Sequence, residues 1–249
     1  MKYYRPETIE EAIKLLSDGV PLAGGTSLAP RRRSLEAVID LDRLGMDQIS
    51  VEDNRVQIGA AAKLQDLVDL RTDLPADLVK ACRLEAAWNL RNMATFGGTI
   101  VSAEARSPLL VVLLALGTQV SVHAEVSTIS LNEILDRRGE IDKPFLVEQI
   151  SFDLPEALSY EFVARAPTDR PLVSAAAAFF PEGKLPFVAI GGFGERPLLL
   201  QPGMGTTSAE WKQLAAEKYA GAGDAFASAE YRSEIVATLV ARVVEEVQS

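Results

Sequence analysis

The chain has 249 residues, 48% of them hydrophobic, which is enough for one large domain or two modest ones with a sizeable core. Its formal net charge of −10 at pH 7 opposes binding to nucleic acid and to anionic membranes. One cysteine, Cys82, and one histidine, His123, exclude an internal disulfide, a four-cysteine iron–sulfur or zinc site and a histidine-rich metal centre within this chain.

The first forty residues predict a helix, a strand, a glycine loop and a second strand. Thr8-Ile9-Glu10-Glu11 fits a helix-capping box, and Gly19 ends the helix that follows it. Val20–Ala23 and Ala37–Leu41 are apolar and predict the two strands. Between the strands lies the first glycine loop, Leu22-Ala23-Gly24-Gly25-Thr26-Ser27-Leu28.

The middle of the chain predicts a hairpin that turns at Asp53-Asn54, then helices over 64–70 and 76–90. The second glycine loop follows, Arg91-Asn92-Met93-Ala94-Thr95-Phe96-Gly97-Gly98-Thr99. Pro108 then opens an apolar run to Leu116, which predicts a buried helix with proline in its first turn, and a strand is expected over 119–123.

That apolar run is the longest in the sequence, and it is shorter than the ~20 residues of a membrane span. The N-terminal residues also lack the apolar segment of a signal peptide. We therefore expect a cytoplasmic protein that does not insert into a membrane.

The last part of the chain predicts antiparallel strands followed by helices. Residues 136–144 are typical of a linker, and a turn is expected at 181–184. Strands are predicted over 145–152, 159–165, 172–180 and 187–190. A helix is expected over 208–219, and a second starts at Ser228, with Ile235, Leu239, Val243 and Val247 on one side. The pattern predicts an α+β fold with domains at 1–143 (subdomains 1–50 and 51–143) and 144–249.

The two glycine loops carry the functional prediction. Paired glycines allow positive φ and let successive N–H groups converge on one anion, so they can hold a pyrophosphate without many basic residues. Two such loops in one domain favour a bound dinucleotide, although Gly24 and Gly25 could also form a simple tight turn. The glycines at 191–194 follow a strand and predict close packing rather than a phosphate site.

Three basic features lie near these loops and remain open to two interpretations. The run Arg31-Arg32-Arg33 is either a solvated surface patch or a local positive field beside a bound phosphate. Lys63 and Arg91 are either phosphate ligands or solvated charges at helix ends.

The chain resembles the FAD-binding (medium) subunit of the molybdenum hydroxylases, a family that includes the flavoprotein subunits of carbon monoxide dehydrogenase and xanthine dehydrogenase. The resemblance spans nearly the whole chain. It is carried by Tyr4-Arg5-Pro6, both glycine loops, Val38-Ile39-Asp40-Leu41, Ile58-Gly59-Ala60-Ala61, Gly191-Gly192-Phe193-Gly194 and Ser228-Ala229-Glu230-Tyr231-Arg232.

The resemblance implies FAD lodged between two α+β subdomains, with a C-terminal α+β domain covering part of the flavin. It implies no catalytic side chain and no metal in this chain, because the flavin carries the redox chemistry. The residues it assigns to FAD binding are Leu22, Ala23, Gly24, Gly25, Thr26, Ser27, Leu28, Thr95, Gly97, Gly98, Thr99, Ala103 and Ser107.

Four residues depart from the family pattern around the second loop. Ala94 and Thr99 stand where the family has the first glycine and the asparagine of Gly-Thr-Ile-Gly-Gly-Asn. Ala105 and Pro108 stand where it has a proline and a carboxylate. Arg106 or Ser107 could replace part of the lost polar contact.

The resemblance also implies partners: a large subunit with the molybdenum cofactor and a small iron–sulfur subunit. Electrons would arrive from the iron–sulfur centres and leave to NAD⁺, a quinone or oxygen. We therefore expect the FAD-binding electron-transfer subunit of an oxidoreductase. The alternative is a flavin-free structural subunit of the same kind of complex, with a degenerate FAD site.

Overall fold

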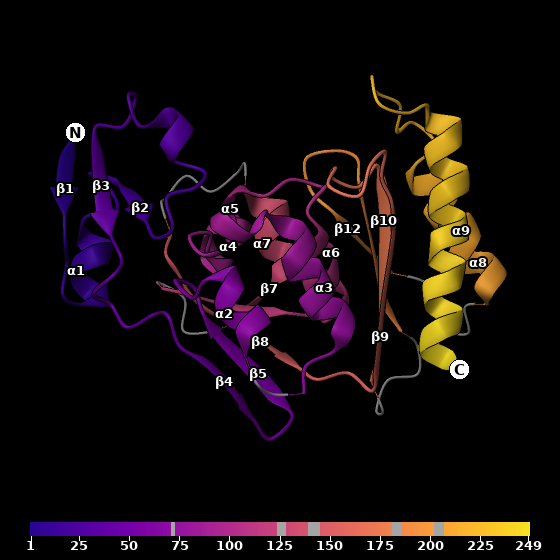
Figure 1. The fold of residues 1–249 in the computed structure, drawn as a ribbon, viewed down its shortest axis with the longest axis horizontal. Helices are drawn as coiled ribbons and strands as arrows, with labels where there is room; N and C mark the ends of the chain where they lie inside the picture. Colours follow the sequence, from indigo (N-terminus) through magenta and orange to yellow (C-terminus); the bar gives the residue numbers. More distant parts are fainter. Residues whose placement is uncertain (71–72, 124–127, 139–144, 181–185, 202–206) are drawn as a thin grey trace. The chain divides into compact units, whose positions relative to one another are not determined.

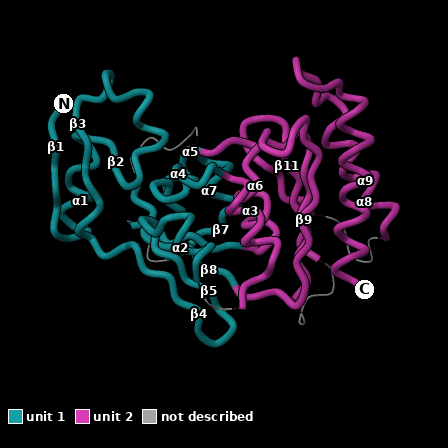
Figure 2. The backbone as a smooth tube through the Cα atoms, in the orientation of Figure 1, with its two compact units in different colours: residues 1–72, 86–102, 118–152 teal, residues 73–85, 103–117, 153–249 magenta. Residues whose placement is uncertain are grey.

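The computed structural model describes residues 1–70, 73–123, 128–138, 145–180, 186–201 and 207–249. The chain forms two compact units (Figure 2). Unit 1 comprises Met1–Thr72, Ala86–Ser102 and Thr118–Phe152, and unit 2 comprises Asp73–Glu85, Ala103–Gly117 and Asp153–Ser249. The units are interleaved along the sequence, and the consecutive domains expected at 1–143 and 144–249 stay a prediction.

Unit 1 begins with a small parallel sheet in the order β1-β3-β2 (Figure 1). Its strands are β1 (Lys2–Tyr4), β2 (Val20–Leu22) and β3 (Ala37–Asp40), with α1 (Ile9–Lys14) and the short η1 (Ala29–Arg31) in the connections. All four residues of β3 are buried, because β3 lies between the other two strands. The predicted cap of α1 is confirmed, since the Thr8 side chain accepts a hydrogen bond from the Glu11 N–H.

A second sheet of unit 1 has the order β4-β5-β8-β6-β7. Its strands are β4 (Ile49–Glu52), β5 (Arg55–Gly59), β6 (Gln119–Val122), β7 (Ile129–Ser130) and β8 (Val147–Asp153). The predicted hairpin is confirmed: Asp53 and Asn54 join β4 and β5 with φ values of 48° and 65°, the left-handed conformation that a tight hairpin turn needs.

The remaining helices of unit 1 are short: α2 (Leu64–Asp69), α4 (Trp88–Arg91), α5 (Phe96–Ser102) and α7 (Leu131–Arg137). Two predictions are wrong here. Residues 96–99, expected in a loop, form the first turn of α5. The linker expected at 136–144 begins inside α7, which Ser130 caps by accepting the Glu133 N–H, while 139–144 lie outside the described residues.

The single helix expected over 76–90 is divided into α3 (Ala76–Glu85) in unit 2 and α4 in unit 1. A continuous helix would give the Ala86 carbonyl to the amide of Leu90. The Arg91 guanidinium instead takes that carbonyl at 2.8 Å, and Ala87 is extended, so α4 starts anew.

Unit 2 is an antiparallel sheet between two pairs of helices. The strands β9 (Ala157–Val163), β10 (Val173–Phe179), β11 (Phe187–Gly191) and β12 (Leu198–Leu200) follow the order β12-β11-β10-β9. The helices α3 and α6 (Pro108–Ala115) cover one side, and α8 (Ser208–Lys218) and α9 (Ala229–Gln248) lie on the other (Figure 1). The turn expected at 181–184 lies outside the described residues.

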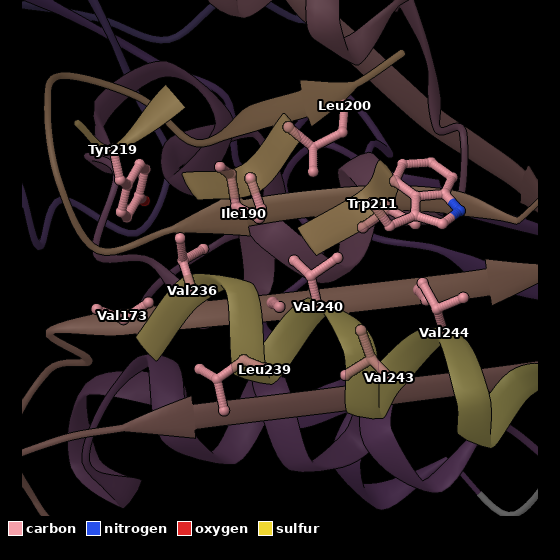
Figure 3. Close-up of a cluster of buried hydrophobic side chains, with 14 of the residues drawn as sticks. Val173, Ile190, Leu200, Trp211, Tyr219, Val236, Leu239, Val240, Val243 and Val244 are labelled. Carbon is pink, nitrogen blue, oxygen red and sulfur yellow. The ribbon is translucent and has the colours of Figure 1, made fainter. Parts of the chain in front are cut away.

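The core of unit 2 explains two apolar patterns of the sequence. Leu239 and Val243 of α9 are buried against the sheet (Figure 3). Val247 is buried in the same cluster and Ile235 packs against it, as the spacing of the four residues predicts. Every residue of α6 is buried, with Pro108 in its first turn, which confirms the buried helix. No helix in the described part of the chain is both long and apolar enough to cross a membrane.

Candidate functional site

The two glycine segments, far apart in sequence, meet within unit 1. A Cβ atom added at Gly24 would lie 1.7 Å from the Met93 carbonyl oxygen and 2.6 Å from its carbonyl carbon. No side chain fits there, so glycine is required for the first loop to pass over the backbone that leads into the second. The two segments therefore form one junction, as two halves of a single binding site must.

The first loop, between β2 and η1, presents a run of free backbone donors. Gly25 has φ +70°, and its carbonyl accepts the amides of Leu28 at 3.1 Å and Ala29 at 2.8 Å. In the described part of the chain, no acceptor is present for the amides of Ala23, Gly24, Gly25, Thr26 and Ser27. Leu28 is buried and anchors the loop, while Ala23 and Ser27 are exposed. Successive free amides at a positive-φ glycine suit an anion.

The amides of the second glycine pair bond within the protein. The Gly97 amide donates to the Ala60 carbonyl at 2.8 Å, and the Gly98 amide donates to Thr95 Oγ1 at 3.2 Å. A Cβ at Gly97 would lie 2.8 Å from the Ala60 side chain. Gly97 therefore packs α5 against the end of β5, and the amides of both glycines bond within the protein. A phosphate-binding role for them stays a prediction.

Thr95 lies at the centre of this junction. It forms an isolated antiparallel bridge with Lys63, held by hydrogen bonds from the Leu64 amide to the Ala94 carbonyl (2.9 Å) and from the Phe96 amide to the Ala62 carbonyl (3.1 Å). Thr95 itself is buried. The bridge fixes the start of α2 beside the start of α5.

Arg91, a candidate phosphate ligand, points into the protein instead. Its Nε donates to Gln65 Oε1 at 2.9 Å and its Nη1 to the Ala86 carbonyl at 2.8 Å. Its neighbours Trp88 and Met93 are largely exposed. Arg91 therefore holds α4 in place and is removed from the candidate ligands.

The hydroxyls of Thr99 and Ser107 bond within the protein, and a contact of these residues with a cofactor stays a prediction. The Thr99 hydroxyl is buried and donates to the Thr95 carbonyl at 3.0 Å. Ser107, in unit 2, is fully buried at the N-terminus of α6, where its hydroxyl donates to Glu85 at 2.6 Å and accepts the Leu110 amide. The reason is helix capping, which the sequence Ser-Pro at the start of an apolar run also signals.

Glu85 is nearly fully buried in this cluster. Burial raises the pKa of its carboxyl group, and the hydrogen bonds from Ser107 and from the Leu109 amide oppose the rise. The carboxyl thus links the end of α3 to the first turn of α6.

Arg106 and Ala103 also belong to unit 2. Arg106 donates to the backbone carbonyls of Pro171 and Arg170 at 2.9 and 2.6 Å, and its guanidinium lies 5.0 Å from the ring centre of Phe226. Arg106 therefore joins loops of unit 2, and its replacement of a polar contact with a cofactor stays a prediction. Ala103 is half-buried.

The glycines at 191–194 pack closely, as the sequence predicts. A Cβ at Gly191 would lie 2.4 Å from Val111 Cγ2, and one at Gly192, where φ is +115°, would lie 2.3 Å from the Leu172 carbonyl oxygen. Sequence reasoning missed Ala60 and Gln65, which hold α5 and Arg91. The run Ala60-Ala61-Ala62 directly after β5 was the available signal for the close approach of α5.

A family model described as "FAD binding domain in molybdopterin dehydrogenase" matches residues 1–155. The glyceraldehyde dehydrogenase medium chain of Sulfolobus acidocaldarius is 30% identical over 218 residues, 78% of this chain and 76% of that protein. The uncharacterized protein YgfM of Escherichia coli K12 is 33% identical over 140 residues, so the matched part spans 54% of this chain and 53% of YgfM.

Among solved structures, a chain of the carbon monoxide dehydrogenase from Hydrogenophaga pseudoflava superimposes with a TM-score of 0.83. The match covers 100% of this chain and 97% of that chain, at 22% identity. The likeness confirms the expected α+β fold.

Proposed function

Because the chain belongs to the family of FAD-binding domains of molybdopterin dehydrogenases, we propose that it binds FAD at the junction of its two glycine segments and transfers electrons within a larger oxidoreductase. The observation that carries the proposal is the first loop. It offers consecutive free amides from Ala23 to Ser27, and Gly24 holds it directly against the backbone of Met93.

The residues of the first loop fit the diphosphate of FAD. Backbone N–H dipoles bind phosphate oxygens without a buried cation, which suits a chain of net charge −10. Leu28 anchors the loop in the core, and the positive φ of Gly25 turns the amides in one direction. Bound FAD supplies the redox chemistry, so this chain has only to position the cofactor and to exclude competing reactions.

The partners follow from the same family membership. The relative in Sulfolobus acidocaldarius is called a medium chain, which indicates an enzyme of several subunits. We propose a large subunit carrying the molybdenum cofactor and a small iron–sulfur subunit that delivers electrons, with NAD⁺, a quinone or oxygen as the external acceptor. A cytoplasmic location is part of the proposal.

The test is the visible spectrum of the chain purified from a flavin-replete host. We expect flavin absorption and release of FAD on denaturation. Gly24→Ala should lose the flavin, because its Cβ would collide with Met93, while Gly221→Ala should keep it, since a Cβ at Gly221 meets nothing within 4 Å.

Circular dichroism of Gly24→Ala distinguishes local loss of the site from global unfolding. A colourless wild-type chain that does not bind added FAD would contradict the proposal. That result would instead identify the flavin-free structural subunit.

A further inference from the structure

The bridge between Lys63 and Thr95 places a lysine beside the proposed FAD site. The hydrogen bonds from Leu64 to Ala94 and from Phe96 to Ala62 make Lys63 and Thr95 a directly opposed, non-hydrogen-bonded antiparallel pair. In such a pair the two side chains leave the backbone on the same side, with Cβ atoms about 4.5–5.5 Å apart. The Lys63 stem therefore begins beside Thr95.

Thr95 directly follows the backbone on which the first loop rests. Gly24 contacts Met93 and lies 3.2 Å, measured from an added Cβ, from the Cα of Ala94. Lys63, Thr95 and the free amides of the first loop are therefore parts of one junction inside unit 1. A flexible four-carbon stem gives the ammonium group freedom to reach across it.

The ammonium group of Lys63 is also free to bind a ligand. Lys63 is exposed, and in the described residues no carboxylate lies within ion-pair distance of its Nζ. The neighbouring Asp66 carboxylate accepts the Lys63 backbone amide at 2.9 Å and so helps to start α2. By contrast, both bonding faces of Arg91 are taken by Gln65 and Ala86.

We propose that the Lys63 ammonium group forms an ion pair with the diphosphate of FAD, an inference that rests on the proposed function. The free amides supply only partial charges, and the full positive charge of an exposed lysine beside them would strengthen the attraction of a diphosphate to a chain of net charge −10. A lysine is a point charge that suits phosphate oxygens. The Lys63 ammonium group also compensates for the polar contact that Thr99 does not offer, because the Thr99 hydroxyl donates to the Thr95 carbonyl.

The test compares FAD dissociation constants of the apoprotein variants, measured by quenching of flavin fluorescence. We expect Lys63→Met to weaken FAD binding about tenfold and Lys63→Arg to stay within about threefold of wild type. Lys14→Met is the matched control: Lys14 is an exposed lysine of α1 in the same unit, and its substitution changes the net charge equally.

Salt provides the second readout. The tenfold difference between wild type and Lys63→Met should shrink when the salt concentration rises from about 0.1 M to about 1 M, because the Debye length falls from about 10 Å to about 3 Å. Lys63 is exposed and takes part in the start of α2 through its backbone amide, so thermal unfolding of Lys63→Met should match that of wild type.

Each result has one meaning. Equal FAD affinity of Lys63→Met and Lys14→Met overturns the ion pair but leaves FAD binding intact. Equal weakening by Lys63→Met and Lys63→Arg, independent of salt, indicates a local structural effect and also overturns it. A wild-type chain that does not bind FAD refutes the proposed function itself.

Discussion

Arg232 shows how one side chain can join three segments of unit 2. It is fully buried, its Nη1 donates to the carbonyls of Leu172 and Gly192 at 2.7 Å, and its Nη2 contacts both carboxylate oxygens of Asp224 at 2.7 Å. A buried guanidinium is tolerated only when it is paired.

Removing the partner of Arg232 should therefore be costly. We expect Asp224→Ala to lower the free energy of unfolding by about 3 kcal/mol, because the guanidinium stays buried without its counter-charge. Asp42→Ala removes a surface ion pair with Arg5 and should lower the free energy of unfolding by less than about 1 kcal/mol. Urea unfolding monitored by circular dichroism measures both. Equal effects would show that Arg232 does not need Asp224.

Glu85 makes a prediction about pH. Burial raises the pKa of its carboxyl group in the folded chain above the value of an unfolded chain, so the folded state binds this proton more tightly. The stability that this tighter proton binding by Glu85 contributes is fully present below the unfolded pKa of about 4.3. It is lost as pH rises through the raised pKa of the folded state. The unfolding free energy of wild type should therefore fall relative to that of Glu85→Gln as pH rises.

The measurement is the difference between the two unfolding free energies in a series of buffers from acidic to neutral pH. A difference that stays constant, or that grows in favour of wild type toward neutral pH, would contradict the burial of an ionisable Glu85.

At this scale the sequence identified the loop residues but not what each one does. Gly24 was correctly singled out for lack of bulk, yet the group that approaches it is the backbone of Met93. Thr99 and Ser107 carry a hydroxyl whether they contact a cofactor or bond within the protein. Only the fold shows that the Thr99 hydroxyl bonds to the Thr95 carbonyl and the Ser107 hydroxyl to the Glu85 carboxylate. Local sequence cannot distinguish a hydroxyl that caps a helix from one that meets a ligand.

At the scale of elements, β10 presents only small side chains over four consecutive residues, because Ala175–Ala178 are all alanine and all fully buried. Helix α9 packs on one side of the strand and α6 contacts it as well. Small side chains let helices approach a sheet from both sides, so there is little room for larger ones.

Overpacking this strand should destabilise unit 2. We expect Ala177→Leu to lower the free energy of unfolding by about 1–3 kcal/mol, because Ala177 belongs to the core beneath α9. Ala209→Leu, at an exposed position of α8, is the matched control and should change it by less than about 0.5 kcal/mol. Thermal unfolding of both variants measures the difference. Equal midpoints would show that the core around Ala177 has room for a larger side chain.

Most elements could be predicted from periodicity, capping residues and turn residues, as the hairpin at Asp53-Asn54 and the stripe of α9 show. The failures have tertiary causes. Glycines disfavour helices, so Gly97 and Gly98 predict a loop, but both lie in α5, where Gly97 allows close contact with Ala60. The break between α3 and α4 depends on Arg91, whose target Ala86 cannot be read from helix propensity.

At the scale of the whole molecule, unit 2 takes two of its helices from the first half of the chain. Both α3 and α6 lie within residues 1–143, yet they pack against β9, β10 and β11. The family match to residues 1–155 therefore includes helices whose buried faces depend on strands beyond it.

A fragment of residues 1–143 should consequently not fold into a well-packed state. It would expose α6, all of whose residues are buried in the full chain. We expect this fragment to aggregate or to bind the dye ANS strongly, whereas the full chain should bind ANS weakly. A monomeric fragment with cooperative thermal unfolding would contradict this expectation and would support the consecutive domains.

A cut after Gly117 would leave two polypeptides, each carrying parts of both units. The five-stranded sheet of unit 1 would be divided, with β4 and β5 in one piece and β6, β7 and β8 in the other, and α3 and α6 would be separated from the strands they pack against. The pieces should therefore stay associated and should reassemble when mixed, as in fragment complementation. The connectivity thus makes each half of the chain a specific template for the other.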